Sequence, residues 1–204
     1  MPHTSTRAFP LALYLLICLG FIILFIIAKN PPSSLDTAIS NYFQNLNVPF
    51  LNAVMSGASF LGETWPSILL AASVTVWLWV KGLRREAVWF VIALLAVSST
   101  TSLIKNIADR TRPNGEEFSF ISGHTSYFTV FGGYLVVNFQ KLVHQISLLT
   151  LGRAVIITIV AIIAFSRIYL GVHWPTDVLG GFLWGLIVLI PVSWAVDSRQ
   201  RIAA

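Results

Sequence analysis

The sequence predicts an all-α membrane protein in which six transmembrane helices form one bundle. Of its 204 residues, 56% are hydrophobic and only 10% are charged, whereas a soluble domain carries about 25% charged residues. The apolar residues also occur in long runs, separated by small groups of basic residues. The sequence lacks the apolar–polar alternation with a period of two that is typical of a transmembrane barrel. The formal charge is +5, but the basic residues form neither a patch nor a tail in the sequence. We therefore expect the partner to be a lipid bilayer and not a nucleic acid.

Six stretches approach the length of about 20 apolar residues that a membrane span requires. Each should be an α-helix, because a helix satisfies its own backbone polar groups in lipid. The first run is too long for a signal-peptide core and lacks a small-residue cleavage site, so we interpret it as a retained anchor. We find no repeat or linker and expect a single domain, residues 1–204. The six stretches are Leu11–Ala28, Pro66–Val80, Ala87–Ile104, Thr125–Phe139, Val155–Leu170 and Val178–Val196.

Basic residues between the runs predict the orientation. One side of the membrane carries more basic residues than the other, once the basic residues that belong to motifs are left out of the comparison. The side with more basic residues should be cytoplasmic. Both termini would then be cytoplasmic, as expected for an integral protein of a bacterial inner membrane. The cytoplasmic set is Arg7, Lys81, Arg84, Arg85, Lys141, Arg153, Arg199 and Arg201. The outer set is Lys29, Lys105, Arg110, Arg112 and Arg167, of which the last four fall within the motifs described below.

Two further patterns concern packing. In the first outer loop, Pro31-Pro32 ends the preceding helix, and apolar residues then recur from Leu35 to Leu46 at helical spacing. This predicts a short amphipathic helix on the membrane surface, either as a simple cover or as a gate for substrate. In the last span, Gly181 and Gly185 favour close approach to a neighbouring helix.

The first of three polar motifs contains Lys105 and Arg112, which Pro113 follows. On a continuous helix Lys105 and Arg112 would share a face. Pro113 disfavours helix at Arg112, so we expect the helix to stop there and the guanidinium to turn inward. Two cations suit an anion with several oxygens, and arginine supplies a two-pronged donor. A basic helix end among lipid headgroups would give the same pattern.

The second motif is Ser122-Gly123-His124 at the start of the fourth span. Serine is a preferred N-cap, glycine permits close backbone approach, and the free N–H groups of a helix N-terminus bind anions. The histidine can transfer a proton. A capped helix with an unrelated histidine remains an alternative.

The third motif runs from Ser166-Arg167 to His173 and Asp177. A helix beginning near Pro175 could bring His173 and Asp177 together, and proline is favoured in a first turn. A carboxylate bonded to one ring nitrogen would make the other a better nucleophile, although a purely structural His–Asp pair is equally compatible. Together, the cations, the helix N-terminus and the histidines match the requirements of phosphoryl transfer.

The three motifs resemble, in order and spacing, the signature of the type 2 phosphatidic acid phosphatase superfamily. They read Lys105-x6-Arg112-Pro113, Ser122-Gly123-His124 and Ser166-Arg167-x5-His173-x3-Asp177. The resemblance implies a six-helix fold and metal-free, cofactor-free hydrolysis of a phosphate ester. The family usually has proline before Ser-Gly-His, where this chain has Ile121. We expect this difference to reduce preorganisation of the turn without removing activity.

The resemblance also implies a role for each residue. His173 would attack phosphorus and form a phosphohistidine, Asp177 would orient it, and His124 would protonate the leaving group and then activate water. The phosphate oxygens would be held by Lys105, Arg112, Ser122, the Gly123 N–H and Arg167.

A site at the outer membrane boundary would be reached by lipid headgroups. The expected substrates are undecaprenyl pyrophosphate, ranked first, then phosphatidylglycerophosphate and phosphatidic acid. An anion transporter using the same cations is the main alternative, but transport sites commonly lie at mid-membrane. A haem carrier with His124 and His173 as ligands is a third class, which the neighbouring cations disfavour.

Overall fold

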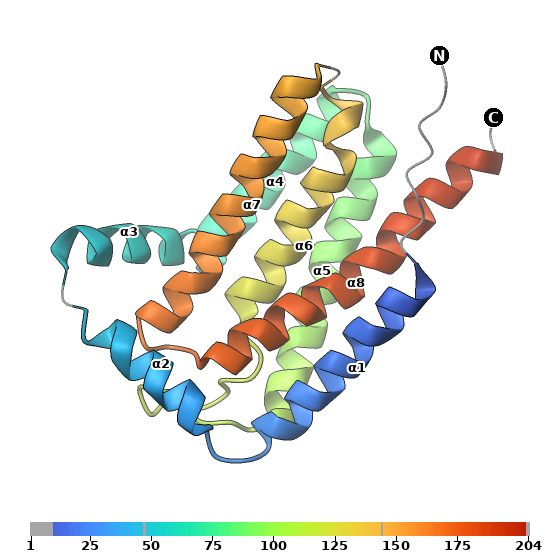
Figure 1. The fold of residues 1–204 in the computed structure, drawn as a ribbon. Helices are drawn as coiled ribbons and strands as arrows, with labels where there is room; N and C mark the ends of the chain where they lie inside the picture. Colours follow the sequence, from blue (N-terminus) through green and yellow to red (C-terminus); the bar gives the residue numbers. More distant parts are fainter. Residues whose placement is uncertain (1–9, 47, 144, 203–204) are drawn as a thin grey trace.

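The computed structural model describes residues 10–46, 48–143 and 145–202, and this part of the chain is helical with no strand. Figure 1 shows α6 among α5, α7 and α8, with α1 alongside α8 and with the start of α1 and the end of α8 toward the same end. In chain order the elements are α1 (Leu11–Ala28), α2 (Ser34–Gln44), α3 (Pro49–Phe60), α4 (Thr64–Val80), α5 (Arg84–Ala108), α6 (Gly123–Asn138), the 3-10 helix η1 (Phe139–Lys141), α7 (Ile146–Tyr169) and α8 (Pro175–Ile202).

All six stretches expected to span the membrane are helical. Within the described residues, four helices are long and apolar enough to cross it, namely α1, α5, α7 and α8. The other two are shorter, with 17 residues in α4 and 16 in α6. The boundaries of α1 match the expected ones, whereas α7 begins at Ile146 rather than at Val155.

The central helix α6 packs against α5, α7 and α8. Its aromatic face meets α5, where the ring of Phe90 lies 5.3 Å from that of Phe131 and 5.4 Å from that of Tyr134. Its other face meets α8 at Gly185, where a Cβ atom would lie only 2.6 Å from Thr129 Cβ. This confirms the packing expected of the glycine pair, because any side chain there would force the two helices apart.

The end of the bundle away from α2 gathers basic residues. Lys141 Nζ lies 2.9 Å from Glu86 Oε1, and the Arg85 guanidinium donates to the carbonyl oxygen of Val196 at 2.6 Å. These contacts join the start of α5, η1 and the last turns of α8. Of the other basic residues expected at this end, Arg7 and the side chains of Arg199 and Arg201 lie outside the described residues.

The opposite end is covered by α2, which lies across the loops there (Figure 1). This confirms the expected short helix after Pro31-Pro32, and Ser33 caps it by accepting from the Asp36 N–H at 3.0 Å. A second helix, α3, was not anticipated. Pro49 stands in its first turn, and it packs against α7.

Candidate active site

The turn between α7 and α8 contains His173, whose side chain is almost completely buried. The expected helix does begin at Pro175 and places Asp177 in its first turn. The Nδ1 atom of His173 lies 3.7 Å from Asp177 Oδ2. This corrects the expectation of a hydrogen bond, since that distance exceeds hydrogen-bonding range. The carboxylate is therefore a close neighbour of the ring rather than its bonded partner.

His173 lies outside the membrane-spanning helices, and its buried side chain has cationic groups as well as Asp177 nearby. Burial lowers the pKa of its imidazole from the ordinary 6.5 to about 4. The Asp177 carboxylate opposes this shift, while the positive charges of Lys105 and Arg167 add to it. The ring is therefore neutral at neutral pH, which is the form that can act as a nucleophile.

Asp177 is held by four donors other than His173. Arg110 Nη1 lies 2.6 Å from its Oδ1, and the Trp174 N–H donates to its Oδ2 at 2.8 Å. The Ser119 hydroxyl also donates to Oδ2. In addition, its backbone carbonyl accepts from the Ser122 N–H at 3.0 Å. The carboxylate is thus fixed in direction without a contribution from the histidine.

Two residues of this network had no predicted role. Arg110 belongs to the first motif, yet its guanidinium contacts carboxylates rather than the predicted phosphate site: Asp177 on one side, and Asp36 on α2 at 2.9 Å on the other. Asp36 is buried although it lies in an amphipathic surface helix. The signal that could have identified Asp36 is its place among the apolar residues of that helix, as an acid with no basic partner nearby in the sequence.

Ser122 caps α6 as expected, because its Oγ accepts from the Thr125 hydroxyl at 2.9 Å and, more weakly, from the Thr125 N–H at 3.4 Å. Its own hydroxyl hydrogen is not used in these bonds and can be donated to a phosphate oxygen. Gly123 begins the helix, and a Cβ atom there would lie 3.8 Å from Lys105 Cε. The predicted anion-binding helix start and the predicted lysine are thus neighbours.

His124 faces the turn that joins α3 to α4. Its Nε2 lies 3.2 Å from the carbonyl oxygen of Ser59 and 3.7 Å from Glu63 Oε1. Gly62 packs directly on the ring, where a Cβ atom would lie 2.1 Å from His124 Cδ2. These contacts come from residues that the motifs do not include, and they leave no room for a side chain at position 62.

The three predicted phosphate-binding cations lie on three different segments. Lys105, in the last turn of α5, donates to the carbonyl oxygen of Phe118 at 2.6 Å. Arg167, in the last turn of α7, is buried and donates to the Ser59 hydroxyl. The charges of both act on both histidines, so these four groups form one cluster.

Arg112 reaches the cluster from a loop. Helix α5 ends at Ala108, and Asp109 then takes a left-handed conformation with φ of 50°. Arg112 therefore does not share a helix face with Lys105, although the two charges interact. Its guanidinium is 2.6 Å from Glu116 Oε2, while its Nε is buried with no partner among the described residues.

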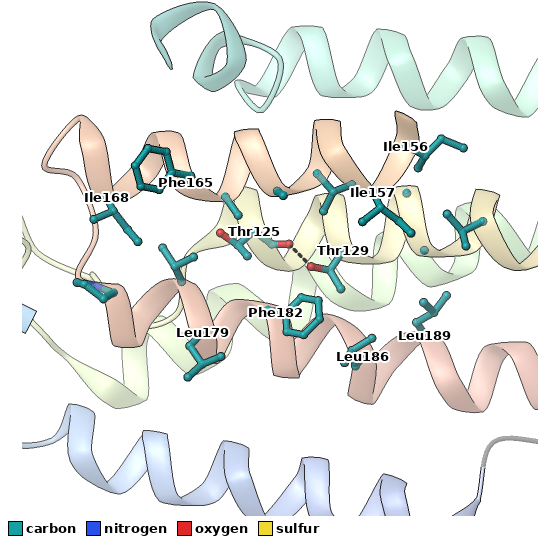
Figure 2. Close-up of a pocket in the computed structure, with 18 residues that line it drawn as sticks. Thr125, Thr129, Ile156, Ile157, Phe165, Ile168, Leu179, Phe182, Leu186 and Leu189 are labelled. Carbon is teal, nitrogen blue, oxygen red and sulfur yellow. Dashed lines mark hydrogen bonds between the residues drawn. The ribbon is translucent and has the colours of Figure 1, made fainter. Parts of the chain in front are cut away.

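An apolar pocket of about 510 Å³ lies between α6, α7 and α8. Figure 2 shows Thr125 and Ile168 toward one end and Ile156 and Leu189 toward the other. Pro175, two residues after His173, is also in its lining. The pocket thus begins near the starts of α6 and α8, close to His124 and His173, and extends along the bundle. Almost all the side chains that line it are apolar.

Comparison with known proteins gives consistent matches. The family model of the PAP2 superfamily matches residues 86–201. Phosphatidylglycerophosphatase B of Bacillus subtilis (strain 168) is 32% identical over 189 residues, which cover 86% of this chain and 90% of that protein. An Escherichia coli (strain K12) protein, provisionally named as an undecaprenyl-diphosphatase, is 29% identical over 66% of this chain and 69% of its own length. The crystal structure of a transmembrane PAP2 type phosphatidylglycerolphosphate phosphatase from Bacillus subtilis matches with a TM-score of 0.77 and 26% identity, covering 91% of this chain and 96% of that one.

Proposed function

This chain belongs to the PAP2 superfamily and is a membrane lipid phosphatase, and from that premise we propose that it works through a phosphohistidine on His173. The single observation that supports this most strongly is the buried, neutral His173 amid cationic groups. A neutral imidazole is nucleophilic, and the surrounding cations favour the pentacoordinate phosphate with its extra negative charge.

The proposed reaction has two steps. Nε2, the ring nitrogen remote from Asp177, attacks phosphorus while His124, in its protonated form, gives a proton to the departing alkoxide or phosphate oxygen and becomes neutral. His124 then takes a proton from water, which attacks the phosphohistidine, releases inorganic phosphate and restores the free imidazole. Lys105, Arg112, Arg167, Ser122 and the Gly123 N–H would bind the phosphate oxygens throughout. No metal ion or cofactor enters either step.

The proposed substrate is a phosphate carried on a lipid chain, with the phosphate among the cations and the chain in the apolar pocket. Among headgroups, we place phosphatidylglycerophosphate first, because the relative of that name is matched over 90% of its length. Undecaprenyl pyrophosphate and phosphatidic acid follow.

The proposed topology has six spans with both termini in the cytoplasm. It is supported by the basic residues at one end of the bundle, where the start of α5, η1 and the last turns of α8 meet. The histidines lie at the opposite end. Single cysteines at positions 83 and 114, in a background that lacks Cys18, would test it in sealed cells. An impermeant thiol reagent should label position 114 and not position 83, and the reverse result would invert the topology.

The activity is tested by phosphate release from the purified protein in detergent with EDTA present. The three lipids are supplied in parallel to the wild type, His173→Ala and His124→Ala. We expect release by the wild type only, and rapid quenching with labelled substrate should trap acid-labile, base-stable phosphate on the wild type but not on His173→Ala. Hydrolysis that survives His173→Ala would refute the mechanism. Uptake of phosphate into vesicles without any hydrolysis would instead favour an anion transporter.

A further inference from the structure

A buried guanidinium shared by two carboxylates connects α2 with the start of α8. Arg110 Nη2 lies 2.9 Å from Asp36 Oδ2, and its Nη1 lies 2.6 Å from Asp177 Oδ1. None of the three side chains is more than 3% exposed. Buried charges are tolerated only when they are paired, and removing one partner leaves the other uncompensated. The position of Arg110 therefore depends on both carboxylates at once.

Asp36 also completes the N-terminus of α8. Trp174 stands at the N-cap position, and its side chain has no oxygen to accept from the first free N–H groups of the helix. The Asp36 carboxylate does so instead: its Oδ1 accepts from the Thr176 N–H at 3.0 Å, and its Oδ2 accepts from the Thr176 hydroxyl at 2.9 Å. A negative charge at a helix N-terminus is favoured by the helix dipole as well. A residue of α2 thus caps a helix that begins 139 positions later in the sequence.

These contacts act on the atoms beside the nucleophile. Arg110 occupies Asp177 Oδ1, so Oδ2 is the oxygen that lies toward His173 Nδ1. The Thr176 hydroxyl accepts a second bond from Arg110 at 2.7 Å, which closes the network between α2 and α8. Loss of the Asp36 charge would free the guanidinium and the first turn of α8, and Asp177 Oδ1 would lose the donor that fixes it.

We propose that Asp36 is a positioning residue of the phosphatase site, which holds Asp177 beside His173 through Arg110 and Thr176. The proposal rests on the proposed function, since it concerns the same nucleophile. Asp36 lies outside the three motifs and outside the family match at residues 86–201. Helix α2 would then help to position the catalytic residues, rather than only cover the loops at this end of the bundle.

The test is the Asp36→Asn variant, which keeps the shape of the side chain and removes its charge. We expect kcat to fall about 10- to 100-fold, since small displacements of reacting groups have effects of this size. KM should stay within about twofold, because the phosphate-binding cations make no contact with Asp36 and binding would be untouched. The matched control is Asp109→Asn, an exposed acid at the end of α5 whose left-handed conformation asparagine also adopts. It should leave both constants unchanged.

A double-mutant cycle separates positioning from general damage to the fold. Because Asp36 acts in part through Arg110, Asp36→Asn should lower kcat by a smaller factor in the Arg110→Gln background than in the wild type. Equal factors in the two backgrounds would overturn the proposal, as would an unchanged kcat in Asp36→Asn. If Asp36→Asn does not fold, as judged by its melting temperature and elution profile, Thr176→Val decides: a loss of kcat supports the proposal and an unchanged kcat overturns it. A wild type that is inactive on every lipid would instead refute the proposed function itself.

Discussion

The backbone N–H of Ser122 donates to the carbonyl oxygen of Asp177 at 3.0 Å, so the first turns of α6 and α8 are bonded directly to each other. One of these helices begins with the segment that carries His124, and the other begins two residues after His173. The contact is possible because position 181 is glycine, where a Cβ atom would lie 2.6 Å from the Ser122 carbonyl oxygen. The spacing between the two histidines is therefore controlled by backbone atoms.

The Gly181→Ala variant should displace the Ser122 segment, because backbone atoms cannot move aside as a flexible side chain can. We expect kcat to fall about 10- to 100-fold in the phosphate-release assay, together with a lower melting temperature. The control is Gly57→Ala on α3, where a Cβ atom meets nothing within 4 Å. It should retain full activity, and an equal loss in both variants would contradict the argument.

Activity should persist to unusually low pH. Because burial lowers the pKa of His173 to about 4, the imidazole remains neutral between pH 6.5 and 4, where an ordinary histidine becomes protonated. As pH falls through about 4, the ring gains a proton and loses its nucleophilicity. The acid limb of kcat/KM should therefore lie near pH 4. The melting temperature at each pH serves as a control, and an acid limb near 6.5 with the fold intact would contradict the assignment.

Glu116 should compete with substrate for Arg112. The Arg112 and Glu116 side chains are 23% and 63% exposed, and such exposed pairs contribute about 0–1 kcal/mol. The Glu116→Gln variant frees the guanidinium, so KM should fall by up to about fivefold with kcat unchanged. Glu117→Gln, an exposed acid next in the chain, is the matched control. A raised KM in Glu116→Gln alone would mean that Glu116 contributes to binding instead.

Filling the apolar pocket should discriminate against long lipid chains. Ala164 lines it, and in Ala164→Phe the new ring would displace about two methylene groups of a bound chain, worth about 0.8 kcal/mol each. KM for a long-chain lipid phosphate should rise about tenfold, while hydrolysis of a short, water-soluble phosphate ester should not change. Ala72→Phe on the exposed face of α4 is the control. Equal effects on both substrates would place the chain elsewhere.

The helices could be predicted from the sequence because apolar runs of span length have few other structures in lipid. The start of α8 was predictable for a local reason, since Pro175 favours a first turn. The position of Arg112 was harder, because the helix before it ends four residues earlier, at Ala108, with a left-handed Asp109. Helix α3 was missed because its 12 residues are too few for a span and follow another short helix.

The candidate residues could be predicted from motif spacing, but not the partners that hold them. Asp36 interacts with Arg110 and Thr176, 74 and 140 residues away. The place of Asp36 in its helix marks the residue but not its partners, because long-range pairing depends on how α2 lies across the bundle. The direct hydrogen bond expected between His173 and Asp177 was wrong for a related reason: other parts of the chain supply enough donors to satisfy the carboxylate.

Because the apolar pocket opens toward the lipid, the substrate concentration that matters for this protein is the concentration within the membrane. Side chains at its rim, such as Ile157, Leu179 and Phe182, are 57%, 49% and 43% exposed, and in a membrane they face acyl chains rather than water. A lipid entering there diffuses in two dimensions and exchanges with bulk lipids that have similar tails. Saturation is then governed by the mole fraction of phosphorylated lipid in the bilayer. Diluting a vesicle suspension should leave the turnover rate unchanged, whereas diluting the substrate with inert lipid should slow it.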